Sequence, residues 1–326
     1  PAARAGIKAG DYITHINGEF LYGFSLDEAV DKMRGKPGSA IKLTIVRPGR
    51  DKPFDVTIVR ERIELKPVKW EVHDRVGVIN INAFSAQTGA MTREALMSID
   101  KATGGQTLGY VVDLRSNPGG LLDQSVEVSD AFLTEGEVVS ERGREKEDID
   151  RFYAKPGDLA HGLPVIVLID AGSASAAEIV AGALQDHRRA LVMGERSFGK
   201  GSVQTVLQTG PTTALRLTTA RYFTPSGRSV QGNGIEPDIA VPQLSDPDYK
   251  ARPRLREADL RRHLINQAGV KDDLLESDDL ADPRFSATAT ELEKKGIKDF
   301  QLDYAIKALR RLGPAAVSAP AKGRAR

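Results

Sequence analysis

Short runs of alternating apolar and polar positions mark the first part of the chain. Residues 12–16, 41–45 and 54–59 alternate in this way, which is typical of β-strands with one face exposed to solvent. Residues 25–33 indicate a helix instead, because a capping serine is followed three residues later by a glutamate and the apolar residues recur with a helical period. This pattern predicts a small β-rich unit over residues 1–62.

The middle of the chain, residues 63–242, alternates between short apolar runs and segments with a helical period. The apolar runs span 77–81, 108–114 and 163–169, and the helical segments span 87–102, 122–133 and 175–186. A run without polar positions is typical of a strand that is covered on both faces. Alternation of such strands with helices predicts parallel βαβ units, so we expect an α/β core.

Charged helical patterns dominate the part of the chain that follows. Residues 243–312 contain charged helical segments near 254–267 and 299–312, and they predict a C-terminal helical extension. Residues 313–326 are rich in alanine, proline, glycine and basic residues, a composition that predicts a disordered tail.

Composition excludes several classes of function. The 326 residues carry a formal net charge of +1, so neither nucleic acid nor an acidic membrane surface is favoured as a partner. There is no cysteine, which excludes disulfides, thiolate metal sites and cysteine nucleophiles. No apolar run approaches the ~20 residues of a membrane-spanning helix. The chain starts at Pro1 without a visible signal peptide, so we expect it to begin within a longer protein.

A serine-containing turn is the first candidate for chemistry. Residues 169–180 read IDAGSASAAEIV, which combines the end of a buried strand, a turn of small residues and the start of a helix. Ligands of open α/β sheets bind at such carboxyl ends of strands, and the free N–H groups of a helix N-terminus favour developing negative charge. Ser175 lies at that N-terminus, where it is either a nucleophile or an ordinary helix cap.

A lysine between two glycines is the second candidate. Lys200 follows an apolar strand, and a neutral lysine can act as the general base of a serine, although most lysines in glycine turns are surface residues. Gln204 lies four residues further on, and positions four apart on a strand share one face, so its amide could orient the lysine amine. The spacing also resembles a phosphate-binding P-loop. Gly201 replaces the Ser or Thr of that loop, however, and the residues after it predict strands at 203–207 and 214–222 rather than a helix.

A glycine turn is the third candidate. Within residues 111–122 an apolar strand ends at Gly119 and Gly120, just before a predicted helix. Adjacent glycine N–H groups are suitable donors to the oxyanion of an acyl-transfer reaction. An ordinary turn between a strand and a helix explains the same pattern.

Competing chemistry finds little support in the remaining residues. His187 lies beyond a helix of roughly 18 Å, at 1.5 Å per residue, so it would be too far from Ser175 to serve as its base. The chain lacks the Gly-x-Ser-x-Gly elbow of α/β-hydrolases and the His-Glu-x-x-His motif of zinc proteases. We therefore expect neither a metal nor a cofactor. Glu178, one helical turn from Ser175, is expected to support the turn at most.

Four segments together resemble the signatures of the carboxyl-terminal processing proteases, in both order and spacing. They are residues 113–120 (DLRSNPGG), 172–179 (GSASAAEI), 198–204 (FGKGSVQ) and 221–238, which contains RYFTPSGR and GIEPD. The resemblance covers roughly residues 1–242. It departs at Ala177, where the family often carries a serine that is not the nucleophile.

This resemblance implies a role for each candidate residue. The nucleophile of the family falls on Ser175, its lysine on Lys200 and its supporting glutamine on Gln204. The N–H groups of its oxyanion hole fall on Ala176 and on one of the two adjacent glycines, with Gly120 favoured.

The N-terminal unit resembles part of a second known domain. Residues 10–18, followed by the helix at 25–33, are similar to the second half of a PDZ domain. Such domains bind peptide C-termini by adding a strand to the edge of a sheet. The loop that would hold the terminal carboxylate should precede Pro1, so we expect a partial PDZ-like domain here.

The resemblance implies a crotonase-like α/β protease core over residues 63–242, between the partial PDZ-like domain and the helical extension. Its implied function is an ATP-independent serine endopeptidase that uses a Ser–Lys dyad and cleaves proteins at or near their C-termini. The alternatives are a catalytically silent PDZ-type peptide-binding scaffold and a crotonase-like acyl enzyme. Relatives imply a bacterial cell-envelope or periplasmic location, substrates with apolar C-termini, a lipoprotein adaptor in some cases and a homo-oligomer, without nucleic acid.

Overall fold

The computed structural model divides the chain into two compact units, Pro1–Lys66 and Pro67–Arg326. It describes residues 1–8, 10–63, 66–145, 147–249, 251, 256–260, 264, 282 and 284–312. Most of the helix predicted near 254–267, and the whole tail predicted at 313–326, lie outside the described residues.

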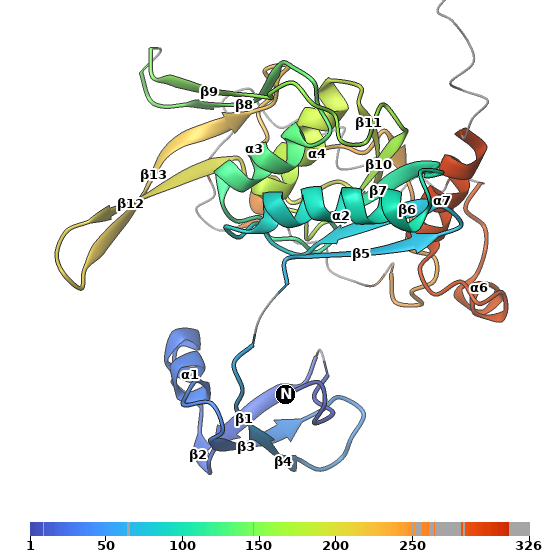
Figure 1. Ribbon diagram of the computed structural model, residues 1–326. Helices are drawn as coiled ribbons and strands as arrows, with labels where there is room; N and C mark the ends of the chain where they lie inside the picture. Colours follow the sequence, from blue (N-terminus) through green and yellow to red (C-terminus); the bar gives the residue numbers. More distant parts are fainter. Residues whose placement is uncertain are drawn as a thin grey trace, which may run out of the picture. The chain divides into compact units, whose positions relative to one another are not determined.

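The N-terminal unit is a four-stranded sheet with one helix, and its strand order is β2-β1-β3-β4 (Figure 1). Its elements are β1 (Tyr12–Ile16), β2 (Glu19–Phe20), α1 (Leu26–Met33), β3 (Ala40–Val46) and β4 (Phe54–Val59). The predicted capping box is present, because Ser25 accepts from the backbone of Glu28 while the Glu28 carboxylate accepts from the backbone of Ser25. Alternate strand residues such as Leu43 and Ile45 form the buried core of this unit.

The larger unit is built around a six-stranded sheet with the order β14-β11-β10-β7-β6-β5. The strands are β5 (Val68–His73), β6 (Val76–Ile81), β7 (Gly109–Asp113), β10 (Val165–Ile169), β11 (Ala190–Gly194) and β14 (Ile239–Ala240). All neighbours are parallel except β5 and β6. The carboxyl ends of the parallel strands therefore meet at one edge of the sheet, and the turns that carry the candidate residues follow them.

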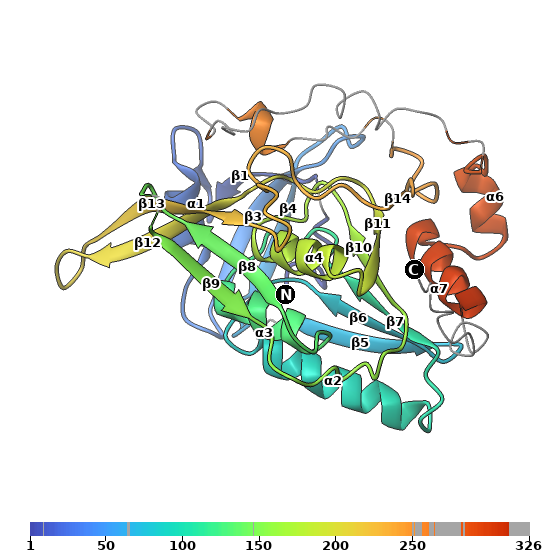
Figure 2. The same ribbon diagram turned by 90° about the horizontal axis from the view of Figure 1, so that it is seen from above.

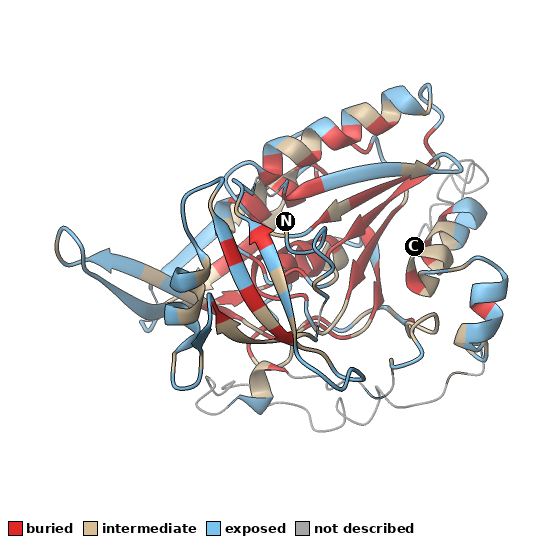
Figure 3. Ribbon diagram, turned by 90° about the horizontal axis from the view of Figure 1, so that it is seen from below, coloured by how far each residue is buried: buried red, intermediate tan, exposed pale blue. Residues whose placement is uncertain are grey.

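Helices cover both faces of this sheet (Figure 2). They are α2 (Thr88–Ala102), α3 (Leu122–Asp130) and α4 (Ala176–Asp186) on one face and α7 (Phe300–Leu312) on the other. Along β10, Val167 packs in the apolar cluster of the first three helices, whereas Ile166 and Leu168 pack in a second cluster with Ala305 and Leu309 of α7. Because successive strand residues point to opposite faces, a strand covered on both faces must be apolar throughout. The central strands of this sheet are coloured as buried in Figure 3.

A second, antiparallel sheet of the larger unit has the order β12-β13-β8-β9. Its strands are β8 (Glu137–Arg142), β9 (Ile149–Tyr153), β12 (Ser202–Gln208) and β13 (Ala214–Phe223). Only residues 221–223 of β13 pair with β8, so the rest of the β12–β13 hairpin projects from the body (Figures 1 and 2).

The main elements of the α/β core are confirmed, with three differences. The strands predicted at 77–81, 108–114 and 163–169 are present to within two residues. Strands β5, β8, β9 and β14 were not predicted. Helix α7 packs on the central sheet within the same compact unit, so a separate helical extension over 243–312 is not confirmed. The compact units divide between Lys66 and Pro67, four residues beyond the predicted boundary at 62.

Candidate active site

Ser175 occupies a strained position between β10 and α4. Its backbone has φ 55° and ψ −115°, in a region that non-glycine residues rarely adopt, and such strain clusters at functional sites. The preceding turn is fixed by Ser173, whose hydroxyl donates to the carbonyl of Leu114 (2.8 Å) and accepts from the backbone N–H of Asp170 (2.9 Å). Ser173 is thus a structural residue of the turn, and Ser175 is the serine in the strained conformation.

A completely buried carboxylate lies behind Ser175. The backbone N–H of Ser175 donates to Glu178 Oε2 (2.8 Å), and the backbone N–H of Lys200 donates to the same oxygen (2.9 Å). Glu178 Oε1 accepts from the hydroxyl of Ser197 (2.5 Å) and from the backbone N–H of Gly199 (2.7 Å). Burial raises the pKa of Glu178 to about 7, and these four donors oppose that rise. Residues that are far apart in the sequence, Ser175 and Lys200, therefore meet through their backbones at one carboxylate oxygen.

The side chains of Lys200 and Gln204 form no hydrogen bond with Ser175. Lys200 is half-buried, and its ammonium group makes no hydrogen bond or ion pair with the described residues. Gln204 is exposed, and its amide likewise has no hydrogen-bond partner in the described part of the chain. The shared strand face expected for this pair does not form, because β12 begins only at Ser202 and its register shifts between Val203 and Gln204.

Two backbone N–H groups remain open beside Ser175. The N–H of Gly119 donates to Asn117 Oδ1 (2.8 Å), whereas the N–H groups of Gly120 and Ala176 form no hydrogen bond with any residue that the structure describes. Gly119 has φ 93°, and a Cβ at this position would lie 2.8 Å from Ser175 Cβ and 2.9 Å from the Ala176 nitrogen. The glycine turn therefore lies directly against the serine, and only glycine allows this close approach.

Tyr222 of β13 is a neighbour of Ser175 that the sequence analysis missed. Burial and, to a smaller extent, the charge of Glu141 raise the pKa of the Tyr222 phenol to about 12, although an interaction with the Ser175 side chain lowers it in part. The backbone of Tyr222 also donates to the carbonyl of Gly201, next to Lys200 (2.8 Å). The phenol thus stays neutral and faces the serine hydroxyl. Tyr222 belongs to a recognised motif segment, but nothing in its spacing indicates this contact.

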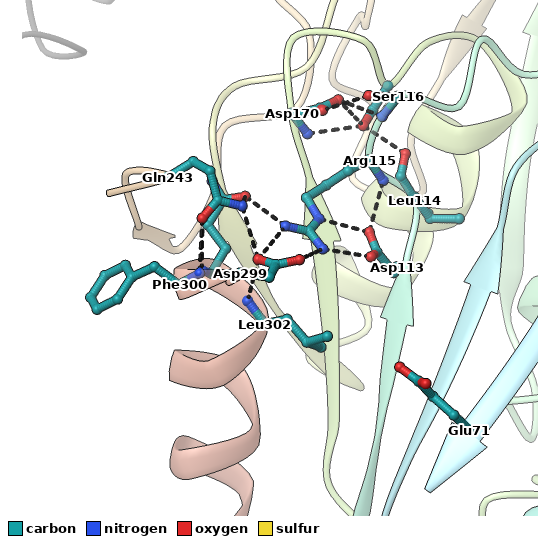
Figure 4. A network of polar contacts seen from close by, with 12 residues as sticks. Glu71, Asp113, Leu114, Arg115, Ser116, Asp170, Gln243, Asp299, Phe300 and Leu302 are labelled. Carbon is teal, nitrogen blue, oxygen red and sulfur yellow. Dashed lines mark hydrogen bonds and ion pairs between the residues drawn. The ribbon is translucent and has the colours of Figure 1, made fainter. Parts of the chain in front are cut away.

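An arginine network lies at the same edge of the sheet (Figure 4). Arg115 binds the carboxylates of Asp113 and of Asp299, the latter just before α7, with closest N–O distances of 2.7 Å. Burial alone would lower the pKa of Arg115, but its hydrogen bonds to the two carboxylates raise it. Ser116, the next residue, donates to Asp170 from its backbone (2.7 Å) and from its hydroxyl (3.1 Å). The network thus connects the turn before Gly119 with the turn before Ser175 and with α7.

Two alternatives from the sequence analysis can be placed in the structure. His187 caps the far end of α4 and its Nε2 lies 2.7 Å from the carbonyl oxygen of Glu137, so it is one full helix away from Ser175. Lys200 is followed by strand β12 instead of the helix that a P-loop requires.

The described residues offer neither a metal site nor a membrane-spanning helix. They contain no group of three or more His, Cys, Asp or Glu side chains placed to hold a metal ion. Within the same residues, no helix is both long and apolar enough to cross a membrane.

Known proteins resemble this chain in sequence. A family model described as peptidase family S41 matches residues 75–241, and a PDZ-domain model matches residues 1–47. The carboxy-terminal-processing protease of Bartonella bacilliformis is 49% identical over 312 residues, which cover 95% of this chain and 69% of that protein. A probable CtpA-like serine protease of Staphylococcus aureus is 38% identical over 253 residues, which cover 77% of this chain. The match spans only 49% of that protein.

Solved structures show the same fold. The photosystem II D1 C-terminal processing protease matches with a TM-score of 0.56 and 29% identity, over 74% of this chain and 65% of that one. An S41 protease structure from Bacteroides fragilis matches with a TM-score of 0.52 and 20% identity, over 78% and 70% of the two chains, and this likeness concerns the fold alone. The crotonase-like description of the core stays a prediction. The chain therefore belongs to peptidase family S41, the family of the carboxy-terminal-processing proteases, and carries a PDZ domain at its N-terminal end.

Proposed function

We propose that this chain is an ATP-independent serine endopeptidase in which Ser175 is the nucleophile and Lys200 is the general base. The observation that carries the proposal is the shared carboxylate: the backbone N–H groups of Ser175 and Lys200 both donate to Glu178 Oε2. A serine in a strained backbone conformation and a lysine from a distant loop are thereby held next to each other. Geometry of this kind suits nucleophilic catalysis by a serine with an adjacent base.

The chemistry follows from the groups around Ser175. Neutral Lys200 takes the hydroxyl proton as Ser175 Oγ attacks the carbonyl carbon of the scissile peptide bond. The N–H groups of Gly120 and Ala176, which have no partner among the described residues, would donate to the oxyanion. Lys200 then returns the proton to the leaving amine as the peptide bond breaks, and it activates the water that hydrolyses the acyl-enzyme.

Lys200 has to move towards the serine for this reaction, since its ammonium group has no partner among the described residues. The Ser175 side chain instead interacts with the Tyr222 phenol, whose pKa it lowers, and this arrangement would be a resting state of the dyad. We retain Gln204 as the residue that orients the lysine in the working state. Its support is its position on β12, the strand that directly follows the lysine.

The substrates that fit this proposal are polypeptides cleaved at or near their C-termini. Support comes from the names of the relatives, one of which is a carboxy-terminal-processing protease and another a D1 C-terminal processing protease. Apolar C-termini, a cell-envelope location, a homo-oligomer and a lipoprotein adaptor belong to the same proposal, by resemblance to this family.

Replacement of each dyad residue tests the proposal. Ser175→Ala, Lys200→Ala and the double variant are compared with wild type in a casein digestion and with a tagged protein substrate. We expect each single variant to lose proteolysis almost completely and the double variant to lose nothing more, because residues that act as one unit are not additive. Substantial activity in Lys200→Ala would rule out the dyad and would require another base.

A further inference from the structure

Glu178 connects the two segments on which the proposed dyad depends. We call residues 170–176 the nucleophile turn and residues 195–201 the lysine loop. The carboxylate of Glu178 accepts one hydrogen bond from the nucleophile turn and three from the lysine loop, and its side chain is fully buried. We propose that Glu178 is a positioning residue, and that its negative charge is required to hold the nucleophile turn and the lysine loop in their working geometry. This inference rests on the proposed function and goes beyond it.

The four partners of Glu178 are all donors. Three of them are backbone N–H groups, which cannot become acceptors, and the fourth is the hydroxyl of Ser197. That hydroxyl also accepts from the backbone N–H of Ile235 (2.6 Å), so its own proton is directed to the carboxylate. A neutral carboxyl group or an amide would place a hydrogen against at least one of these donors. The arrangement is therefore matched to an acceptor-only group, which is an ionised carboxylate.

The bond from Ser175 explains how Glu178 acts on the reaction. In the strained conformation of Ser175, its N–H points back to Glu178 and is not available to a substrate. The next N–H along the chain, that of Ala176, is left open beside Gly119. Loss of this hydrogen bond would allow the strained backbone at Ser175 to relax. Relaxation would turn both the hydroxyl of Ser175 and the N–H of Ala176 away from the scissile carbonyl.

The sharpest test is Glu178→Gln, which keeps the size of the side chain and removes its charge. Each oxygen of Glu178 accepts two hydrogen bonds. In the glutamine variant an NH₂ group replaces one of these oxygens, and it would face two N–H or O–H donors that it cannot accept from. We expect kcat to fall about 10²-fold while KM changes less than threefold, because a small misplacement of reacting groups affects the chemical step. The rate at which a fluorophosphonate probe modifies Ser175 should fall with kcat.

A matched control separates positioning from general damage. Asp158 is another largely buried carboxylate, and it binds Arg189 (2.9 Å) just before β11, at the opposite edge of the sheet from Ser175. Asp158→Asn should lower thermal stability and leave kcat and probe labelling at the wild-type level. If Glu178→Gln lost activity only in proportion to its unfolded fraction, or kept kcat within threefold, the inference would be wrong.

A second variant covers the case in which Glu178→Gln does not fold. Ser197→Ala keeps the charge and removes one of the four donors, so we expect a smaller loss of kcat, about tenfold, again with little change in KM. A folded Ser197→Ala protein with wild-type kcat would overturn the inference. Ser175→Ala is measured beside both: residual cleavage by that variant contradicts the proposed function itself. An inactive Ser175→Ala beside a fully active Glu178→Gln contradicts this inference alone.

Discussion

Two residues of the site have arrangements that lower the stability of the folded protein. Ser175 has a backbone conformation in which non-glycine residues are strained, and Glu178 is a carboxylate without any contact with solvent. Neither arrangement helps the chain to fold. Under the proposed function, both place chemical groups where a reaction on a peptide carbonyl would need them, which is the pattern expected when strain is retained for activity.

Glu178 should make the stability of the protein depend on pH. Burial raises its pKa from 4.5 to about 7, so between these values the folded protein holds a proton that the unfolded chain has released, and the ionised form proposed for the working geometry dominates only above about pH 7. The contribution of Glu178 to stability is therefore fully present below pH 4.5 and is lost as the pH rises through about 7. In urea unfolding, the free energy of unfolding of wild type minus that of Glu178→Gln should fall across this window. If this difference instead rose with pH, the hydrogen bonds to Glu178 would lower its pKa more than burial raises it.

At the scale of elements, α7 is part of the structure that supports the active site. Leu309 and Ala305 are fully buried against strands β6, β7 and β10, and Asp299 connects the start of the helix with Arg115. Strand β10, which leads into the turn that carries Ser175, would have one apolar face uncovered without this helix. The pattern of charged residues at 299–312 predicts a helix. It does not show that the apolar face of this helix packs on the central sheet.

Truncation of one side chain of α7 tests this role. Leu309→Ala should lower the free energy of unfolding by about 2–5 kcal/mol, because it leaves a cavity between the helix and the sheet. Leu312 lies on the same helix and is 39% exposed, so Leu312→Ala is the matched control and should change stability by less than about 1 kcal/mol. Equal effects of the two substitutions in urea denaturation would show that α7 does not contribute its buried face to the core.

For the whole molecule, local patterns predicted much of the fold and part of the site. The strand, turn and helix around Ser175 are contiguous, and their pattern alone indicates the position of the serine. Tyr222 and Asp299 come from β13 and from the segment before α7, so only long-range packing brings them to the site. The predicted face shared by Lys200 and Gln204 does not form, because Lys200 lies before β12 and the spacing of residues does not reveal the register shift between Val203 and Gln204.

The acylation of Ser175 with the help of Lys200 is the central step of the proposed reaction. The most direct measurement is mass spectrometry of the protein after brief mixing with an activated ester of a short apolar peptide, followed by mapping of the acylated residue. We predict an acyl group on Ser175 in wild type, its absence in Ser175→Ala, and an acylation rate at least 10²-fold lower in Lys200→Ala. Acylation of a different residue, or acylation of Ser175 at the wild-type rate in Lys200→Ala, would contradict the account.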